Sequence, residues 1–588
     1  MKKWVILNDK FKVQSGRPLG KFKVDEIIKI LLENRGIKGK KEIDKFLHPS
    51  LDDLTIESVG LERKELDKAV ARIKKAIDSK ESMVVYTDYD ADGVCSGAIV
   101  WESLYGIGAK IMPYVPHRVD EGYGLSKKGI DFIKGVYNAK LIITVDHGIS
   151  AVEKVKYADS LGIDTIILDH HLKPAKLPKA KAIIHTTELA AGGIAWFFCN
   201  YLISKLKGKS YSVSFTSGES FGHPRGGFKA LLQKTEYLLS TNLDLAALAT
   251  IADLVPLTFA NRAIVKFGLE QLNKTERVGF TALIKEAGLK KGDLGVYEVG
   301  HILAPRINSM GRLMHAIDAL RLLCTRDKER ASALAKQLSS TNRERQVLTE
   351  TATIQAIEMV RHEQLTKLLF ISRKEFKEGI IGLVAGKLVE EFYRPAIVVS
   401  QGEIFSKASA RSVNGFNIVE TLHKASELLE DVGGHPMAAG FTVATKNLTL
   451  LKSKLQKIAG RELDKEKLTR SIKVDMILNL KNVTTDFYNK LQQFAPFGVG
   501  NPEPTFASYN AEVIGASLVG RDRQHLKMKV QCRDSSYIFE AIGFSMGDIF
   551  RKIVPHQLID IAYSIDENRW NGNLCLQLKL KDVKFPQQ

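Results

Sequence analysis

Acidic and histidine side chains follow three apolar segments that have the composition of buried β-strands. The segments are MVVYT at 83–87, KLIITV at 140–145 and DTIIL at 164–168. Each is short and rich in β-branched residues, and a helical pattern follows the first. Because the carboxyl ends of parallel strands share one edge of a sheet, we expect the side chains behind them to meet there. These side chains are Asp88, Asp90, Asp92, Asp146, Asp169, His170 and His171.

The first three acids also have the spacing of the beginning of an EF-hand calcium loop. Such a loop needs a bidentate carboxylate at its twelfth position, which is Ile99 here, and it lies between two helices rather than behind a strand. A turn with an N-capping aspartate remains an alternative for each acid taken alone. One aspartate would suffice for that purpose, whereas three close carboxylates repel one another unless a cation or solvent screens them.

A fourth segment, LDLAALATIADLVPL at 243–257, has a helical pattern and carries Asp253 just before Pro256. Asp253 is expected to approach the same site from the side. A site of several carboxylates and one or two histidines suits Mn²⁺ or Mg²⁺ better than Zn²⁺. Two such ions can activate a water molecule and stabilise the leaving oxygen in phosphoester hydrolysis. Asp146 is the best candidate to bridge them.

The composition favours a protein that meets a polyanion. The chain has 588 residues, with 86 Lys and Arg against 67 Asp and Glu, and a net charge of +19. This balance suggests nucleic acid as a partner, with a solubilising surface as the alternative. The five cysteines are scattered and form no CxxC pair, which argues for a reducing compartment and against structural zinc. Neither a signal peptide nor a membrane-spanning run is evident, so we expect a cytoplasmic protein.

The pattern of apolar runs and breakers predicts an α/β protein with a doubly wound parallel sheet and a C-terminal β-barrel. A Ser- and Gly-rich stretch at about 208–227 predicts a surface insertion in the first α/β domain. The expected segments are a helical lead-in at 1–57, an α/β domain at 58–325, one long charged helix at 326–365, a second α/β domain at 366–460 and the barrel at 465–588.

Several motifs together resemble a known family. TDYDADG, TVDHGIS, LDHH and ATIADLVPL resemble the four metal motifs of the DHH phosphoesterase superfamily. Further motifs resemble, in order and spacing over about residues 58–588, the RecJ single-strand-specific exonucleases. They are YVPHRVDEGYGL, APRINSMGR, KEGIIGLVAGKLVEEFYRPAIVV, ASARSVNGFNI, GGHPMAAGF and FAPFGVGNPEP.

This resemblance implies a DHH domain joined by the long helix to a DHH-associated domain, followed by an oligonucleotide-binding (OB) barrel. It also implies a metal-dependent exonuclease that degrades single-stranded DNA from the 5′ end to mononucleotides, in DNA repair and recombination. A helicase and a single-strand-binding protein become candidate partners, and a monomer is expected.

Matched motif to motif, the resemblance also implies a ligand set for two Mn²⁺ or Mg²⁺ ions. The implied ligands are Asp88, Asp90, Asp92, Asp146, His170 and Asp253. Asp146, His170 and His171 would be catalytic, with His171 contacting the scissile phosphate or orienting a ligand. Which of the three first acids bind metal directly stays open. Two positions depart from the usual motifs: Tyr86 stands where many members have His, and His147 where Asn is usual.

A second group of residues is expected to bind the strand and its 5′ phosphate. The glycine-rich turn of GGHPMAAGF would let backbone N–H groups approach a phosphate, and the planar fork of an arginine binds phosphate in bidentate fashion. Tyr123 either stacks on a base or is a core tyrosine. Arg312 or Arg306 would help to hold the phosphate. The candidates are Arg118, Tyr123, Arg306, Arg312, Ser409, Arg411, Gly433, Gly434 and His435.

Two other functions compete with this one. A DHH phosphodiesterase for short oligonucleotides or dinucleotides, or a pyrophosphatase, would use the same metals. The predicted barrel and the net charge of +19 favour longer polymers. A non-catalytic DNA-binding scaffold would not need the metal ligands. Every expected carboxylate and His170 are present, which argues against that alternative.

Overall fold

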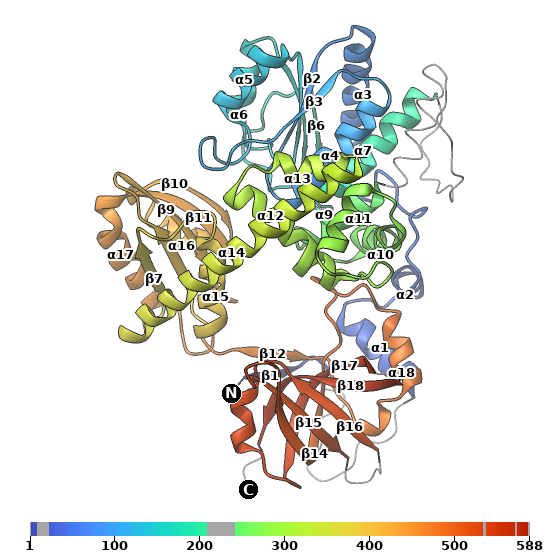
Figure 1. Ribbon diagram of the computed structural model, residues 1–588, viewed down its shortest axis with the longest axis vertical. Coiled ribbons are helices and arrows are strands. Elements are labelled where there is room, and N and C mark those ends of the chain that lie inside the picture. Colours follow the sequence, from blue (N-terminus) through green and yellow to red (C-terminus); the bar gives the residue numbers. More distant parts are fainter. Residues whose placement is uncertain (1, 9–22, 209–241, 533–536, 571–572, 586–588) are drawn as a thin grey trace.

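A computed structural model describes residues 2–8, 23–208, 242–532, 537–570 and 573–585 of the chain. Apart from Gly208, the insertion predicted at about 208–227 lies outside these residues. Figure 1 shows the α/β domain with β2–β6 at the top, a second α/β domain at the left and a β-barrel at the bottom. None of the described helices combines the length and the apolar character needed to cross a membrane.

The first domain is built on a five-stranded parallel sheet in the order β3-β2-β4-β5-β6. All residues of β2 and β4 are buried, which is why their sequences are uninterrupted apolar runs. Helices pack on both faces, so the predicted doubly wound sheet is confirmed. The strands are β2 (Met83–Thr87), β3 (Ile111–Tyr114), β4 (Leu141–Val145), β5 (Asp164–Asp169) and β6 (Ala182–His185).

Two sets of helices cover this sheet. One face packs against α3 (Arg63–Asp78), α4 (Ala91–Gly106) and α7 (Ala191–Leu206), and the other against α5 (Lys127–Tyr137) and α6 (Val152–Ser160). A helical layer completes the domain beside α4 and α7. It consists of α9 (Leu243–Ala252), α10 (Phe259–Lys274), α11 (Val278–Glu286), the π-helix η2 (Glu298–Leu303), α12 (Ala304–Leu313) and α13 (Ile317–Cys324).

A single helix, α14 (Lys328–His362), runs from the first domain to the second (Figure 1). Its N-cap is Asp327, whose side chain accepts hydrogen bonds from the backbone N–H groups of Glu329 and Arg330. α14 packs against α11, α12 and α13 in its first part and against α15 (Ile381–Phe392) in its second. It therefore ties the two domains to one another through its length.

The second domain has a five-stranded mixed sheet in the order β10-β11-β9-β8-β7. The glycine-rich turn predicted at 433–441 is a β-hairpin, in which Gly433, Gly434 and His435 end strand β10 and His435 pairs with Ala438. The chain reverses only at 436–437. The elements are β7 (Leu369–Arg373), β8 (Ala396–Ser400), β9 (Phe405–Arg411), α16 (Ile418–His423), β10 (Leu429–His435), β11 (Ala438–Ala444) and α17 (Leu448–Glu462).

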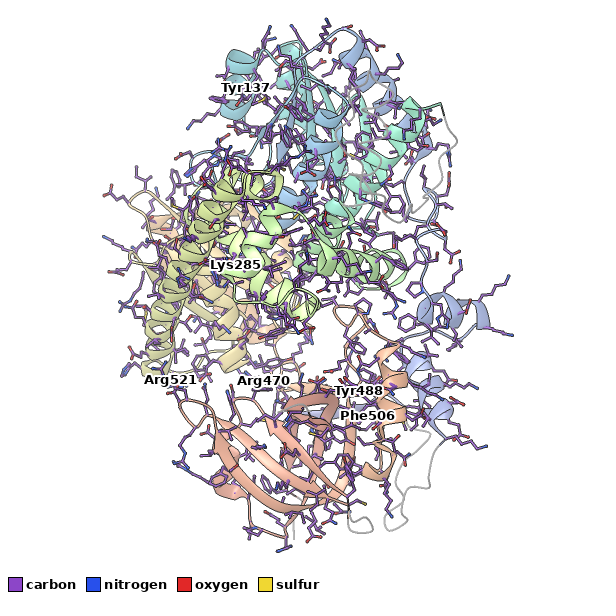
Figure 2. The ribbon with its side chains drawn as sticks, turned by 45° about the vertical axis from the view of Figure 1, so that its right-hand side comes forward. Tyr137, Lys285, Arg470, Tyr488, Phe506 and Arg521 are labelled. Carbon is purple, nitrogen blue, oxygen red and sulfur yellow. The ribbon has the colours of Figure 1, made fainter. Side chains whose placement is uncertain are left out.

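The C-terminal domain is a barrel closed by the pairing of β14 with β17. The sequence analysis missed β17, whose second half is strongly polar. Phe506 and Tyr488 lie in the buried cluster of this domain (Figure 2). The elements are β12 (Ser471–Val474), β13 (Met476–Ile477), α18 (Thr485–Gln492), β14 (Phe506–Val519), β15 (His525–Gln531), β16 (Ile538–Gly543), β17 (Leu558–Trp570) and β18 (Asn573–Lys584).

The sequence predicted a helical N-terminal segment, but the segment begins with strand β1 (Lys3–Ile6). β1 pairs in parallel with β12, and the indole Nε1 of Trp4 donates to Asp582 at 2.8 Å. The helices α1 (Val24–Asn34) and α2 (Lys40–Leu47) follow. A partner strand that lies more than 460 residues away cannot be inferred from a local pattern.

Arg262 of α10 joins the first domain to the N-terminal segment and to the approach to the barrel. Its buried guanidinium donates to the carbonyl oxygens of Phe46 at 2.8 Å, Phe494 at 2.6 Å and Gln493 at 2.9 Å. The guanidinium also stacks 4.2 Å from the ring centroid of Phe46. A buried guanidinium without a carboxylate partner is retained because carbonyl groups from two other segments satisfy it.

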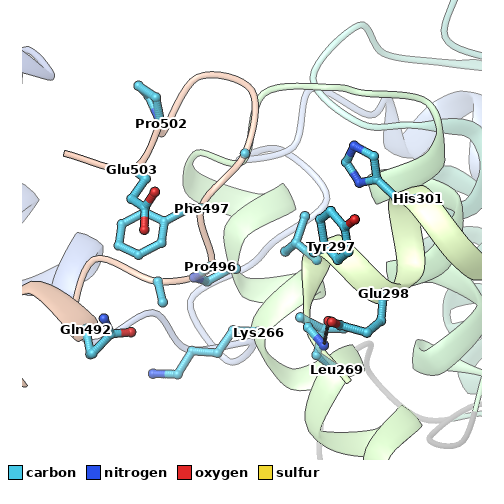
Figure 3. A pocket seen from close by; sticks show the side chains of 14 residues that line it. Lys266, Leu269, Tyr297, Glu298, His301, Gln492, Pro496, Phe497, Pro502 and Glu503 are labelled. Atoms are coloured by element: carbon cyan, nitrogen blue, oxygen red, sulfur yellow. Dashed lines mark hydrogen bonds between the residues drawn. The ribbon is translucent and has the colours of Figure 1, made fainter. Parts of the chain in front are cut away.

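A cavity of about 710 Å³ lies along the same seam (Figure 3). Tyr297 and His301 line it with rings stacked 4.7 Å apart, opposite Phe497. Lys266 and Glu503 also contribute to the lining. None of the residues predicted to bind metal or DNA borders this cavity, so it marks the junction of the domains rather than the reaction site.

Arg262→Met should lower the free energy of unfolding by about 3 kcal/mol, because three carbonyl groups, two of them buried, would lose their donor. Urea unfolding followed by fluorescence measures this change. Lys274→Met, at the exposed end of the same helix, is the matched control. Equal unfolding curves for the two variants would contradict the assigned role of Arg262.

Candidate metal centre

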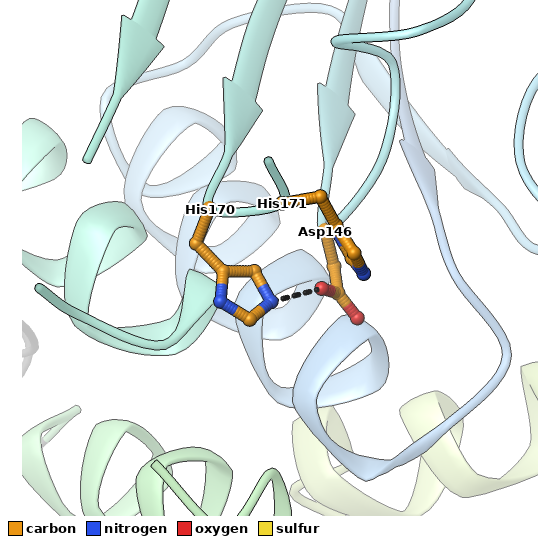
Figure 4. Close-up of side chains that lie close together, drawn as sticks. All are labelled: Asp146, His170 and His171. Atoms are coloured by element: carbon orange, nitrogen blue, oxygen red, sulfur yellow. Dashed lines mark ion pairs between the residues drawn. The ribbon is translucent and has the colours of Figure 1, made fainter. Parts of the chain in front are cut away.

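The carboxyl ends of β2, β4 and β5 bring the predicted metal ligands together. Potential ligand atoms lie within 4.8 Å of one another in three groups. Two of them hold the six predicted ligands: Asp88, Asp90 and Asp146 in one group, and Asp92, His170 and Asp253 in the other. The third consists of Asp146, His170 and His171. Nε2 of His170 lies 3.2 Å from Oδ1 of Asp146, which joins the two groups (Figure 4). The same nitrogen lies 3.7 Å from Asp253 and 3.9 Å from Asp92. All six predicted ligands therefore surround one volume.

The turn after β2 gives its three acids different surroundings. Asp90 is the N-cap of α4, and its Oδ1 accepts from the N–H of Gly93 at 3.0 Å. The capping alternative is thus correct for Asp90, which still faces the metal volume. Asp88 is buried, and its Oδ1 accepts no hydrogen bond from any described residue. Asp146, after β4, has a φ of +67°, a strained conformation of the kind found at functional sites.

Asp92 is held by the start of α7, which the sequence analysis missed. Its two oxygens accept from the backbone N–H groups of Ala191 at 2.9 Å and Gly192 at 2.8 Å. A helix N-terminus stabilises a carboxylate charge. A Cβ at Gly192 would lie 2.3 Å from Cβ of Ala249 on α9. The run of small residues AAGG at 190–193 was the available signal for this close packing.

The buried aspartates of the metal centre repel one another and need a positive charge nearby. Burial, and then the charges of neighbouring aspartates, raise the pKa of Asp88 and Asp146 well above the usual value. The same causes raise the pKa of Asp92 to about 7 and that of Asp253 to about 9. Burial, followed by the charge of His171, lowers the pKa of His170 to about 4, so its imidazole is neutral and free to ligate. This donor set fits Mn²⁺ or Mg²⁺.

His171 is oriented by Asp169, a role that the sequence analysis did not assign. Nδ1 of His171 lies 2.8 Å from Oδ1 of Asp169, whose Oδ2 accepts from the N–H of Ile149 at 2.8 Å. Burial lowers the pKa of His171, but the hydrogen bond to Asp169 and its charge outweigh burial and raise that pKa. The His171 ring stacks on His435 of β10, with centroids 6.2 Å apart. The second domain therefore reaches the metal centre.

Tyr123 lines the centre with its hydroxyl group. The hydroxyl donates to the backbone oxygen of Asp146 at 2.9 Å and lies 3.2 Å from Nε2 of His171. The side chain is 50% exposed, so it is not a core tyrosine. Hydrogen bonds at the metal centre hold the hydroxyl group of Tyr123, whereas its exposed ring is open to a ligand.

The two departures from the usual motifs contact each other behind the centre. The ring of Tyr86 packs edge-on against His147 at 5.3 Å, and Nε2 of His147 lies 3.0 Å from the backbone oxygen of Tyr86. Both are buried, and burial lowers the pKa of His147 to about 4. The pair packs the back of the site and contributes no side chain to the groups of potential ligand atoms.

A cluster of four arginines, Arg118, Arg312, Arg345 and Arg411, lies beside the metal centre, where the charges of Arg118 and Asp88 and those of Arg312 and Asp90 act on each other. Burial, then the charges of Arg118, Arg345 and Arg411, lower the pKa of Arg312 to about 10. Arg411 donates to Oγ of Ser409 at 3.1 Å. Arg345 of α14 was not predicted. A gathering of arginines of this kind fits a phosphate ligand.

Arg306, the predicted alternative to Arg312, lies apart from this cluster. It donates to the backbone oxygen of Ile302 at 2.7 Å and to Oγ of Ser339 at 3.2 Å, on the side of α12 that faces α14. Arg118 belongs to the cluster, because its charge lowers the pKa of both Arg312 and Arg411. Its guanidinium also lies 5.0 Å from the ring centroid of Tyr89, in the metal loop. The exposed Gly433 and Gly434 lie on the β10–β11 hairpin beside His435.

Comparison with protein families matches three parts of the chain. The DHH family N-terminal domain matches residues 82–213, the DHHA1 domain matches 365–461 and the RecJ OB domain matches 474–582. These parts coincide with the parallel-sheet domain, the mixed-sheet domain and the barrel.

Comparison with whole proteins identifies relatives along nearly the entire chain. The single-stranded-DNA-specific exonuclease RecJ of Bacillus subtilis is 36% identical over 563 residues, covering 95% of this chain and 68% of the relative. The crystal structure of RecJ from Thermus thermophilus with Mn²⁺ superposes with a TM-score of 0.78 at 26% identity, covering 97% of this chain and 79% of that one. The structure of the same protein with Mg²⁺ gives a TM-score of 0.72 at 25% identity, covering 97% and 78%.

The raised pKa values predict how the metal-free protein responds to pH. Asp92 and Asp253 have pKa values of about 7 and 9 in the folded protein against 3.8 in a free side chain. Their stabilising contribution is complete below pH 3.8 and is lost as the pH rises through 7 and 9. We therefore expect the unfolding temperature in EDTA to fall from pH 5 to pH 8, and Mn²⁺ to oppose that fall.

Differential scanning fluorimetry of the wild type and of Asp253→Asn measures this effect. The variant lacks one titrating carboxylate, so its unfolding temperature in EDTA should depend less on pH. Identical pH profiles with EDTA and with Mn²⁺ would contradict a carboxylate cluster that requires a cation.

Proposed function

Because this chain belongs to the RecJ family of single-stranded-DNA-specific exonucleases, we propose that it degrades single strands from the 5′ end and releases mononucleotides, in DNA repair and recombination. Its reaction is the metal-dependent hydrolysis of single-stranded DNA. The observation that carries polarity and product is the arrangement of two opposite charge clusters, with the carboxylates at the sheet edge and the arginines facing them.

The cofactor is Mn²⁺ or Mg²⁺. Asp88 and Asp90 would hold one ion, and Asp92, His170 and Asp253 the other, with Asp146 shared between them. When bound, two such ions provide an activated water molecule and stabilise the charge of the leaving oxygen. The protein keeps His170 neutral and supplies the carboxylate charge that the ions need.

We propose that His171 acts on the scissile phosphate. Asp169 fixes its ring and supports its positive charge, so that a proton on Nε2 can be donated to an oxygen of the scissile phosphate. Hydrogen bonds prepared in advance for developing negative charge lower the barrier of such reactions. Tyr123 limits the movement of the same ring through its hydroxyl group.

The arginine cluster would hold the terminal 5′ phosphate. Arg411 and Ser409 lie side by side at the start of α15, where a Cβ on Gly382 would be 3.0 Å from both side chains. Arg312 adds charge on the side that faces the metals, since the charge of Asp90 acts on it. A terminal phosphate bound here and a scissile phosphate at the carboxylates would define both the direction of degradation and the mononucleotide product.

The remaining expectations extend this proposal. The barrel would hold the strand farther from the cut, as OB folds do. The described cysteines are all free, which suits a reducing cytoplasm. We further propose that the enzyme acts as a monomer, with a helicase and a single-strand-binding protein as candidate partners.

Digestion of a 5′-phosphorylated strand, labelled at one end or the other, tests the proposal. With Mn²⁺ or Mg²⁺ the 5′ label should appear early as mononucleotide, whereas the 3′ label should remain on long fragments. EDTA should stop the reaction, and a blunt duplex should resist it. Early release of the 3′ label would reverse the polarity, and cleavage of dinucleotides alone would favour a small-substrate phosphodiesterase.

Arg411→Ala should reduce the preference for 5′-phosphorylated over 5′-hydroxyl strands by about tenfold or more. Hydrogen bonds to charged groups contribute about 1.5–3 kcal/mol. The ratio of kcat/KM for the two strands measures this preference. Arg306→Ala removes an arginine of α12 that lies outside the cluster and should keep the ratio. An unchanged ratio in Arg411→Ala would place the terminal phosphate elsewhere.

A further inference from the structure

Helix α12 lies in direct contact with the metal loop that follows β2. Oδ1 of Asn308 accepts from the backbone N–H of Ala91 at 2.7 Å. One turn later, a Cβ on Gly311 would lie 2.3 Å from the backbone oxygen of Tyr89. Only a glycine at 311 allows this approach. The helix backbone therefore rests directly on the loop that carries Asp88, Asp90 and Asp92.

The end of the same helix is in equally close contact with the second domain. A Cβ on Gly379 would lie 2.2 Å from the backbone oxygen of Arg312. In return, Nη1 of Arg312 donates to the backbone oxygen of Gly379 at 3.1 Å. Gly379 precedes α15 by two residues, and α15 begins beside Ser409 and Arg411.

We propose that these two contacts, at Gly311 and Gly379, form a spacer that sets the distance between the metal centre and the phosphate-binding arginines. Gly311 and Gly379 are then positioning residues for the choice of the terminal nucleotide. This inference rests on the proposed function, because it needs a terminal phosphate at Arg411 and a scissile phosphate at the carboxylates. It assigns the spacing to backbone contacts of α12 rather than to the long helix α14.

The two contacts leave no room for a side chain at residues 311 and 379. A methyl group at residue 379 would meet the backbone of Arg312, which cannot rotate away as a side chain can. The start of α15 must therefore move away from Arg312. A misplacement of about 1 Å between a held group and the reacting atoms can cost about 10²-fold in rate. A strand with a 5′ hydroxyl does not engage the phosphate site and gains nothing from correct spacing.

Gly379→Ala in the full chain tests the spacer. The kcat/KM for 5′-phosphorylated strands should fall about tenfold or more, while that for 5′-hydroxyl strands and the affinity for Mn²⁺ stay within about twofold of wild type. Gly386→Ala is the matched control, because it adds the same methyl group to α15 where no atom lies within 4 Å. A loss that is equal for both strands would be a structural effect and would overturn the proposal.

Gly311→Ala should behave differently, because its methyl group displaces the metal loop. Both strands should be cut more slowly, and Mn²⁺ binding, measured from the spectrum of free Mn²⁺ by electron paramagnetic resonance, should weaken about tenfold. Unchanged Mn²⁺ binding in a folded Gly311→Ala protein would overturn this half of the proposal.

The wild-type enzyme offers a test that does not depend on the folding of a variant. The first nucleoside of the strand is replaced by propanediol, which has the same number of backbone atoms, or by the longer hexanediol, each with a terminal phosphate. A fixed spacing predicts that the propanediol strand keeps the rate advantage of the phosphate and that the hexanediol strand loses it. Equal rates on these two strands would overturn the spacer. A wild type that cuts no ordinary single strand would instead overturn the proposed function.

Discussion

Electrostatic repulsion among five clustered carboxylates at one edge of a parallel sheet is the constraint on which the rest of the structure depends. Asp88, Asp92 and Asp146 are buried, and among the described residues no lysine or arginine lies close enough to any of the three to form an ion pair. Such a cluster is stable only with protons or with divalent cations. The backbone N–H groups at the start of α7 and the neutral His170 suit the second solution. The first domain is thus folded around a site for positive charge.

The second domain supplies the complementary constraint. Burial, and then the charge of Arg118, lower the pKa of both Arg312 and Arg411, and the charge of Arg411 lowers the pKa of Arg312 further. A nucleic-acid strand relieves the repulsion within both clusters, because it can present one phosphate to the metals bound by the carboxylates and another to the arginines. The two clusters lie on opposite sides of the C-terminal end of α12, and its close backbone contacts hold them in register. This is why a fold of separate lobes can act on a single phosphodiester bond.

Strands β2, β4 and β5 and the acidic residues that follow them could be predicted, because an apolar run followed by a polar residue is a local pattern in the sequence. The same is true of Asp146 and of the helix that ends at Asp253. The partners of these residues could not be predicted. The N–H groups that hold Asp92 lie about a hundred residues away, and no side-chain pattern marks a backbone donor.

Arg306 and Arg312 illustrate the same limit within one helix. They are six residues apart and therefore point to different sides of α12. The sequence of the helix alone does not say which side faces α14 and which faces the second domain. The pairing of β1 with β12 likewise depends on a partner that is distant in the sequence. The pairing of Gly433, Gly434 and His435 depends on the whole hairpin of β10 and β11.

Anomalous diffraction from crystals grown with Mn²⁺ tests the central claim most directly. Two peaks are predicted at the carboxyl ends of β2, β4 and β5, about 3.5–4 Å apart, with Asp146 bonded to both. Crystals of Asp146→Asn should lose at least one of them. A single peak in the wild type, or two peaks that do not share Asp146, would contradict a two-metal centre bridged by this residue.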